Sequence, residues 1–122
     1  MKSTVNLPGR GKWPFSDAVR VGDTVYLSGR IGFKPGTMEI PEDAAEEARY
    51  LLDGVREVLE QAGLVMDDLV QVQIFTPDVS LFDVFNKVYV TYFEEEFPAR
   101  AFLGSGPLLF GARFELVAVG AK

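Results

Sequence analysis

The sequence predicts an α+β sandwich in which two helices cover one face of a small sheet. Apolar residues recur at helical spacing in residues 41–62 and again in residues 82–93. Between them, residues 69–76 alternate strictly between Val and Gln at their centre, which is typical of a strand with one buried face. Two short β-rich runs precede the first helix and two follow the second. The predicted order is therefore strand, strand, helix, strand, helix, strand, strand.

The first two strands form a predicted hairpin. Residues 18–21 and 24–28 are rich in β-branched and aromatic residues and flank the two-residue turn Gly22-Asp23. Gly29 and Gly32 follow the second strand. Glycines at a strand end indicate a bulge or a place where another group must approach the backbone.

The two helices carry boundary signals of different strength. Acidic residues crowd the first turns of the helix predicted at 41–62, where the helix dipole favours them, and Gly63 is a natural C-cap. We expect Ser80 to cap the second helix, with Asp83 completing a weak capping box, and the apolar stripe to extend to Phe93.

The end of the chain contributes the last two strands and leaves one face of the sheet open. Pro98 opens a strand near residues 101–103, residues 104–111 form a loop, and residues 113–119 form the last strand. A chain this short has no third layer, so we expect another subunit to cover the second face. That face is predicted to carry Val19, Val117 and Val119.

Composition excludes many kinds of chemistry. The length fits a single domain spanning residues 1–122. The chain has no Cys and no His, which removes zinc–thiolate sites, thiol nucleophiles, Ser-His-Asp triads and imidazole acid–base catalysis. Twelve basic and 18 acidic residues give a net charge of −6, a poor balance for binding nucleic acid. No stretch approaches a membrane span, and the lack of Cys fits a cytoplasmic location.

Two charged clusters have ordinary structural interpretations that we favour. Trp13 and Phe15, with Arg10 and Lys12, could stack single-stranded bases, but we expect Trp13 to pack the irregular arm of residues 8–14 onto the domain. The acidic run at residues 94–96 could hold a metal ion, but a solvated helix end fits better, and we expect no metal site.

Arg100 is the residue type most suggestive of a site. It begins an apolar strand, and a half-buried guanidinium needs an anionic partner. The pattern alone favours a structural salt bridge, and the alternative is a ligand carboxylate or phosphate.

The sequence resembles the RidA/YjgF family of reactive-intermediate deaminases over almost its whole length, from Pro14 to Val119. Its motifs occur in order: Pro14-Phe15-Ser16-Asp17-Ala18-Val19, Leu27-Ser28-Gly29-Arg30-Ile31-Gly32, Phe82-Asp83-Val84-Phe85-Asn86-Lys87-Val88-Tyr89, Phe97-Pro98-Ala99-Arg100-Ala101-Phe102-Leu103 and Phe114-Glu115-Leu116. The fourth is the most specific.

The resemblance implies a chorismate-mutase-like sandwich: a mixed sheet of about six strands with two helices on one face, assembled as a homotrimer around a central barrel. Active members hydrolyse enamines and imines, such as 2-iminobutanoate and 2-iminopropanoate, to 2-keto acids and ammonia without metal or cofactor, in a cleft at each subunit interface. By resemblance, Arg100 grips the substrate carboxylate and acts in catalysis. The other expected cleft residues are Phe15, Ser28, Gly29, Asn86 and Phe102.

The sequence departs from the family pattern at three positions. Phe15 stands where typical members have Tyr, Phe102 where they often have Cys, and Val117 where they have an acidic residue that handles the attacking water. Glu115 lies two residues away, on the same face of a regular strand, and aligns with a different family glutamate. These departures make the cleft more apolar.

Three functions therefore remain open at this stage. The first is a cofactor-free imine deaminase with a substrate preference shifted toward more hydrophobic 2-imino acids. The second is a non-catalytic trimer that binds small 2-imino or 2-keto carboxylates, which Val117 favours. The third, an endoribonuclease or translation inhibitor, is disfavoured by the acidic charge and by the absence of His.

Overall fold

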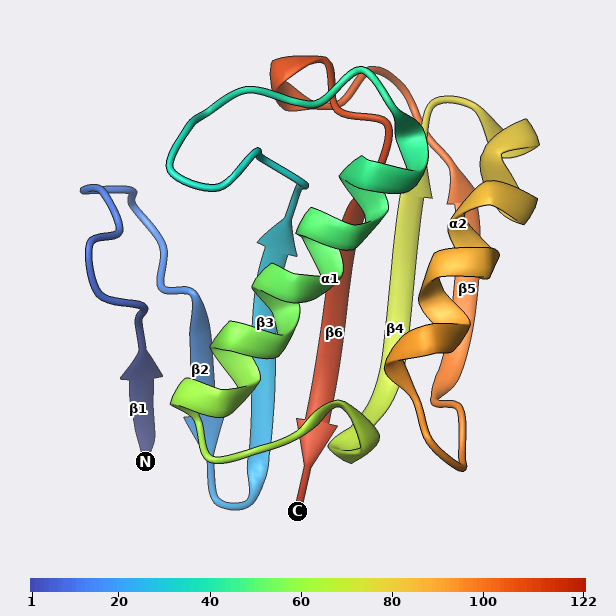
Figure 1. Ribbon diagram of the computed structural model, residues 1–122. Coiled ribbons are helices and arrows are strands. Elements are labelled where there is room, and N and C mark those ends of the chain that lie inside the picture. Colours follow the sequence, from blue (N-terminus) through green and yellow to red (C-terminus); the bar gives the residue numbers. More distant parts are fainter.

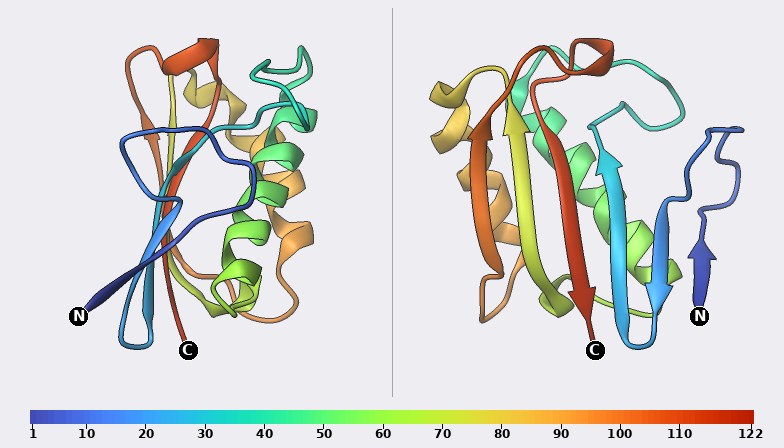
Figure 2. Two further views of the ribbon diagram at one scale, coloured as in Figure 1. Left: turned by 90° about the vertical axis from the view of Figure 1, so that its left-hand side faces the viewer. Right: turned by 180° about the vertical axis from the view of Figure 1, so that it is seen from behind.

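The computed structural model describes residues 1–122 as one mixed sheet with two helices packed against one face (Figure 1). The strand order is β1-β2-β3-β6-β4-β5, with only β4 and β5 parallel. Side and rear views show the helices on one face and the other face bare (Figure 2). The strands are β1 (Lys2–Val5), β2 (Ala18–Val21), β3 (Thr24–Arg30), β4 (Leu69–Thr76), β5 (Ala99–Gly104) and β6 (Glu115–Ala121), and the helices are α1 (Ala44–Gln61) and α2 (Phe82–Tyr89). No helix is both long and apolar enough to cross a bilayer.

The predicted order of elements is confirmed, with one strand added. β1 pairs antiparallel with β2 at the edge of the sheet. Its sequence, Lys-Ser-Thr-Val, has no apolar alternation because three of its four residues are exposed. The sequence of β1 therefore has no pattern that would predict a strand.

The predicted hairpin and the role of the glycines after it are confirmed. Val21 pairs with Thr24 across the turn, and Gly22 has a φ of 60°, which favours glycine. The pairing of β3 with β6 is irregular between Leu27 and Arg30. A Cβ on Gly29 would overlap the Glu115 carboxylate, so this glycine permits a close approach.

Helix α1 begins three residues later than the sequence predicts. Asp43 is still extended and acts as the N-cap, its carboxylate accepting a hydrogen bond of 3.0 Å from the Glu46 N–H. At the other end Gly63 has a φ of 80°, and the N–H groups of Gly63 and Leu64 bond to the carbonyls of Glu60 and Leu59. This Schellman arrangement explains why glycine follows the helix.

Helix α2 is shorter than predicted, and its expected cap is wrong. The regular helix is flanked by single 3₁₀ turns, η2 (Val79–Leu81) and η3 (Val90–Tyr92). Ser80 does not cap the helix. Instead Asp78 caps the preceding turn and accepts hydrogen bonds from the Ser80 N–H and hydroxyl. The aspartate is the better acceptor because it is a charged carboxylate.

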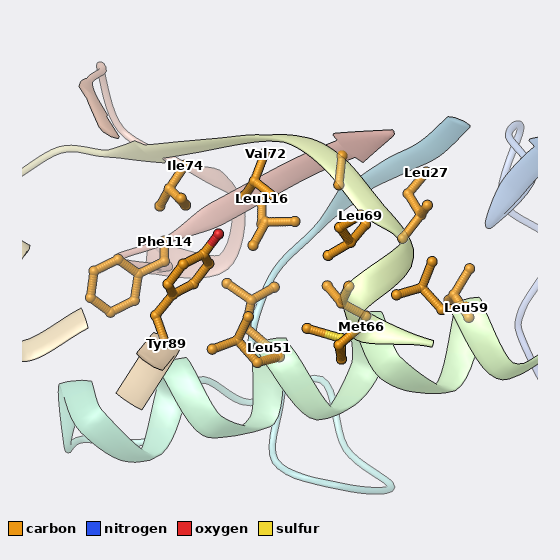
Figure 3. Close-up of a cluster of buried hydrophobic side chains, with 14 of the residues drawn as sticks. Leu27, Leu51, Leu59, Met66, Leu69, Val72, Ile74, Tyr89, Phe114 and Leu116 are labelled. Atoms are coloured by element: carbon orange, nitrogen blue, oxygen red, sulfur yellow. The ribbon is translucent and has the colours of Figure 1, made fainter. Parts of the chain in front are cut away.

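The core lies between the sheet and the helices (Figure 3). Leu51 and Leu59 of α1 are completely buried, as is Ile74 of β4, and Leu116 of β6 is almost so. Phe85 of α2 packs against Phe114 with ring centroids 4.9 Å apart. The apolar alternation of the strands thus faces the apolar stripes of both helices.

The opposite face of the sheet is partly apolar and bare in the single chain. Cross-strand pairing places Val19, Tyr26 and Val119 in one row, with Gln71 of β4 next in line. Val117 pairs with Gln73 in the row above. The predicted placement of Val19, Val117 and Val119 on this face is confirmed.

A buried carboxylate ties α1 to the start of β6. Glu47 has no exposed surface, and its two oxygens accept hydrogen bonds from the Arg113 guanidinium and from the N–H groups of Arg113 and Phe114. The backbone of Glu47 also lies where a Cβ on Gly32 would stand. Glu47 therefore fastens α1 to the start of β6, and its backbone lies close against Gly32.

Candidate functional site

A large pocket lies where the N-terminal arm, the end of β3 and the segment before β6 meet. Its volume is about 890 Å³. Phe15, Ser28 and Gly29, predicted as cleft residues, all line it, together with Glu115. The other apolar lining residues are Trp13, Ile31, Phe33, Met38, Leu109 and Phe110.

A compact ion cluster fixes the polar side of this pocket. Asp17 is buried, and its carboxylate contacts Arg10 Nε at 3.4 Å, Arg30 Nη1 at 3.5 Å and the Leu7 N–H at 2.8 Å. Burial lowers the pKa of Arg30, and the charge of Asp17 partly opposes that shift. Arg10 also donates to the carbonyl of Phe15. The cluster therefore anchors the arm to β3.

Aromatic rings make the apolar wall. Trp13 and Phe15 stack with centroids 6.2 Å apart, and Phe33 meets Phe110 edge-on at 5.1 Å. Phe110 has a φ of 60°, a left-handed conformation that is costly for a bulky residue. Such strain persists only where the surrounding structure enforces it, and it is found at binding sites more than elsewhere.

Arg100 lies far from this pocket, on the helix-facing side of β5. Its guanidinium carbon is 4.7 Å from the ring centroid of Tyr89 and 5.6 Å from that of Phe82. It forms no ion pair within the chain, so the structural salt bridge that the pattern favours is wrong. Stacking on aromatic faces replaces the expected carboxylate.

Two polar groups of α2 that lack a hydrogen-bond partner belong to the same part of the molecule as Arg100. The Asn86 Oδ1 and the Tyr89 hydroxyl are both buried and have no hydrogen-bond partner. Burial raises the pKa of Tyr89 to about 12. The ring of Phe102, next but one to Arg100 on β5, packs between Phe82 and Phe85. Buried polar atoms usually have a partner, so these two groups are available to a water, a ligand or another chain.

The predicted site residues therefore fall into two groups that one chain does not bring together. Phe15, Ser28 and Gly29 lie at the pocket beside β3, while Arg100, Phe102 and Asn86 lie on β5 and α2. Strands β6 and β4 separate β3 from β5. Three strand spacings amount to about 14 Å.

Several residues of the pocket carry no pattern in the sequence that predicts a site. Phe33 and Met38 lie in a loop, and Leu109 and Phe110 lie in a single 3₁₀ turn, η4 (Leu109–Gly111), so none of them follows a period along the chain. The one feature of the sequence that could have indicated these residues is the apolar pair Leu109-Phe110 within a loop rich in Gly. Trp13 was assigned wrongly: it is 47% exposed at the pocket and stacks on Phe15 rather than packing the arm onto the core.

The acidic runs do not bring carboxylates together into a metal-binding cluster. Residues 94–96 are exposed, as expected for a solvated helix end. No group of three or more His, Cys, Asp or Glu side chains has an arrangement that could hold a metal ion.

Comparison with known proteins decides the family. The model of a family described as endoribonuclease L-PSP matches residues 10–122. The chain belongs to this family. The human protein named 2-iminobutanoate/2-iminopropanoate deaminase is 36% identical over 121 residues, covering 98% of this chain and 88% of the human one. The Escherichia coli K12 protein of the same name is 33% identical over 112 residues, covering 89% and 88%.

The fold agrees with this family assignment. The crystal structure of RidA from the Antarctic bacterium Psychrobacter sp. PAMC 21119 has a TM-score of 0.91 and 32% identity, covering 98% of this chain and 99% of that one. The resemblance to RidA/YjgF proteins and the α+β fold class expected from it are confirmed. Members of the L-PSP family thus carry two kinds of name, imine deaminase and endoribonuclease.

Proposed function

We propose that this protein is an imine deaminase that hydrolyses reactive 2-imino acids and enamines to 2-keto acids and ammonia, using no cofactor. Relatives at about one-third identity bear the name of such an enzyme. The observation that carries the proposal is the unpaired guanidinium of Arg100, with the unpartnered Asn86 Oδ1 and Tyr89 hydroxyl on the neighbouring helix. A planar guanidinium with free donors is suited to grip a substrate carboxylate at two points.

The complete site forms between copies of the chain in a homotrimer. In this proposal the bare sheet faces, bearing Tyr26 and Val119, turn inward as a central barrel. The β5 edge of one copy, with Arg100, then meets the pocket of its neighbour, with Gly29. The separation of the two groups of residues by two strands supports this assembly, because neither group is a site alone.

The substrate is a 2-imino acid with a more hydrophobic side chain than 2-iminopropanoate. The pocket of about 890 Å³ has Trp13, Phe15, Phe33 and Phe110 in its wall. The methyl side chain of 2-iminopropanoate would leave most of that apolar surface exposed to water, whereas a branched or aromatic substrate side chain would bury it. Each further buried methylene is expected to contribute about 0.8 kcal/mol to binding.

The chemistry requires positioning more than a strong catalyst. An imine carbon is already electrophilic, so water held at the correct angle is enough to start hydrolysis. Arg100 fixes the carboxylate, and the outward backbone groups of the edge strand β5 are free to hold water. We place the reaction in the cytoplasm, in keeping with a sequence that has no Cys.

The second candidate is a trimer that binds small carboxylates without turning them over. Val117 favours it, because this side chain occupies the position where the family resemblance expects an acid. The third candidate, an endoribonuclease, rests on the family description. It would need RNA binding by a chain of net charge −6, and a titration that finds no RNA binding even at low salt would remove it.

The proposal is tested by a coupled imine assay. An L-amino-acid oxidase generates 2-imino acids from Ala, Leu and Phe, and semicarbazide trapping reports how fast each disappears. Arg100→Ala should lower kcat/KM about 100-fold or more, since it removes about 3 kcal/mol of charge-assisted hydrogen bonding. Arg56→Ala is the matched control: that guanidinium also lies 4.7 Å from a tyrosine centroid, on the outer side of α1.

The possible results separate the candidates. Acceleration by the wild-type protein and by Arg56→Ala, lost in Arg100→Ala, supports the deaminase. No acceleration of any imine by a trimeric sample rules the deaminase out. Calorimetric binding of 2-keto acids by that inactive sample would then establish the second candidate.

A further inference from the structure

Aromatic rings hold the guanidinium of Arg100 where an acid would be expected. Its carbon atom lies over the ring of Tyr89, 4.7 Å from the centroid, and the rings of Phe82 and Phe102 follow at 5.6 and 5.9 Å. A carboxylate in this place would occupy the N–H donors of the guanidinium. A ring instead attracts the cation through its π face and leaves those donors free for a ligand.

The ring of Tyr89 is fixed in place by other rings. Tyr89 is only 4% exposed, and Figure 3 shows its phenol pointing from α2 toward the sheet. Its ring centroid lies 5.8 Å from that of Phe85, 4.8 Å from that of Phe93 and 6.4 Å from that of Phe97. A close-packed core leaves no room for a second orientation of this ring. The surface that Tyr89 presents to the arginine is therefore rigid.

The other arginine–tyrosine pair of the chain differs in its polar contacts. The guanidinium carbon of Arg56 also lies 4.7 Å from a tyrosine centroid, that of Tyr92. There the Tyr92 hydroxyl donates to Asp53 Oδ1 at 2.7 Å, and Arg56 Nη1 lies 3.8 Å from the same oxygen. That pair is closed by its own carboxylate. The pair formed by Arg100 and Tyr89 has no such acid, so it is the one open to an external anion.

The position of Arg100 gives such support a purpose. Its strand, β5, lies at the edge of the sheet, and the side chain is only half-buried. A long side chain at an edge samples many rotamers, and each binding event would have to select one of them. A guanidinium that is already held by a rigid ring loses less freedom when it binds a carboxylate.

We infer that Tyr89 is a positioning residue, whose ring holds the Arg100 guanidinium in the orientation that receives the substrate carboxylate. This inference rests on the proposed function and adds to it the group that aims the arginine. Tyr89 acts through Arg100 and does not itself touch the substrate. Phe82 supports the same guanidinium from the exposed side of α2.

The test measures how strongly each variant prefers a carboxylate. Calorimetry gives the Kd of 4-methyl-2-oxopentanoate and of its uncharged methyl ester, and the ratio of the two is the carboxylate preference. Tyr89→Leu should lower this preference about 10-fold, the equivalent of one partly desolvated cation–π contact. In the coupled imine assay KM should rise by a similar factor while kcat changes less than threefold, because the grip acts on ground state and transition state alike.

The conservative variant separates the ring from the hydroxyl. Tyr89→Phe keeps the ring and should recover most of the preference lost in Tyr89→Leu, because the ring is the part that meets the guanidinium. The double variant Arg100→Ala/Tyr89→Leu should show no lower preference than Arg100→Ala alone, since the ring acts only through the arginine.

Tyr92→Leu is the matched control for lost stability. It also removes a tyrosine ring 4.7 Å from a guanidinium carbon, and it loses the hydrogen bond to Asp53 as well, yet it should leave the carboxylate preference unchanged. Phe82→Leu provides a second variant at the site. Phe82 is 44% exposed, so its loss disturbs the core little, and the preference should fall about threefold. If Tyr89→Leu fails to fold, Phe82→Leu decides.

The results distinguish this inference from the function on which it rests. An active wild-type enzyme whose folded Tyr89→Leu variant keeps its carboxylate preference within twofold overturns the role of Tyr89 and leaves the deaminase intact. A wild-type protein that is inactive on every imine but binds the keto acid loses the deaminase, and the calorimetric ratios still decide the role of Tyr89. An equal fall of the preference in Tyr92→Leu would show that lost stability, rather than the lost ring, is the cause.

Discussion

Removing the buried carboxylate of Glu47 should destabilise the protein by several kcal/mol, as much as truncating a buried leucine of α1. Oε2 accepts from the N–H groups of Arg113 and Phe114 at 2.7 and 3.2 Å, and Oε1 accepts from Arg113 Nη1 at 2.7 Å. In Glu47→Ala both N–H groups lose their acceptor, at a cost of about 1–3 kcal/mol each. Arg113 is one-third exposed and keeps its contacts with two carbonyls, so the lost ion pair adds only about 1 kcal/mol.

The expected total is about 3–7 kcal/mol, a large share of the 5–15 kcal/mol typical of a folded domain. Urea unfolding followed by circular dichroism measures it as a shift of the midpoint at constant m-value. Glu60→Ala, on an exposed position of the same helix, should stay within about 0.5 kcal/mol of the wild type. A loss below about 1 kcal/mol in Glu47→Ala would refute the claim that this carboxylate fastens α1 to β6.

Two further predictions concern residues at the edges of the two half-sites. Burial raises the pKa of Tyr89 to about 12. Because the unfolded chain releases the phenol proton at lower pH than the folded chain, the free energy of unfolding should fall as pH rises from 10 to 12. In urea unfolding, Tyr89→Phe should show less of that fall, and an unchanged fall would contradict the burial of the phenol. Phe110→Gly relieves the strain of a left-handed φ of 60°, which should stabilise the fold by about 1 kcal/mol. It also loses the ring contact with Phe33, which should cost about 1 kcal/mol, so the free energy of unfolding should change little. The same variant should lower the preference for the Phe-derived over the Ala-derived imine about 10-fold, and an unchanged ratio would remove Phe110 from the specificity wall.

Periodic segments were predictable from the sequence because their burial repeats along the chain. The hairpin of β2 and β3, the alternation of β4 and the stripe of α1 all record which face meets the core. Boundaries were less predictable. The start of α1 depends on which acidic residue caps it, and the sequence offers several candidates between residues 42 and 47.

The candidate site was predictable only in part, and for a physical reason. Phe15, Ser28 and Gly29 were expected in a cleft, and they do line the pocket. The aromatic platform beneath Arg100 depends on how α2 lies over β5, a long-range contact that no local pattern encodes. For the same reason Arg100 was expected to need a carboxylate within the chain, whereas tyrosine and phenylalanine faces support it.

The central claim is that Arg100 of one copy and the pocket of another form one site, and a mixing experiment tests it most directly. Arg100→Ala loses the carboxylate grip, and Gly29→Leu places a side chain where the pocket of the neighbouring copy must receive the substrate. Each is expected to keep only a small part of the wild-type rate, and the two are unfolded together in urea and refolded at equal concentrations. In randomly assembled trimers, each of the two copies that meet at an interface contributes its intact half with a probability of about one half. About one interface in four is therefore intact, and the mixture should recover about one quarter of the wild-type rate. A mixture of folded trimers no more active than its parents would contradict a site shared between subunits.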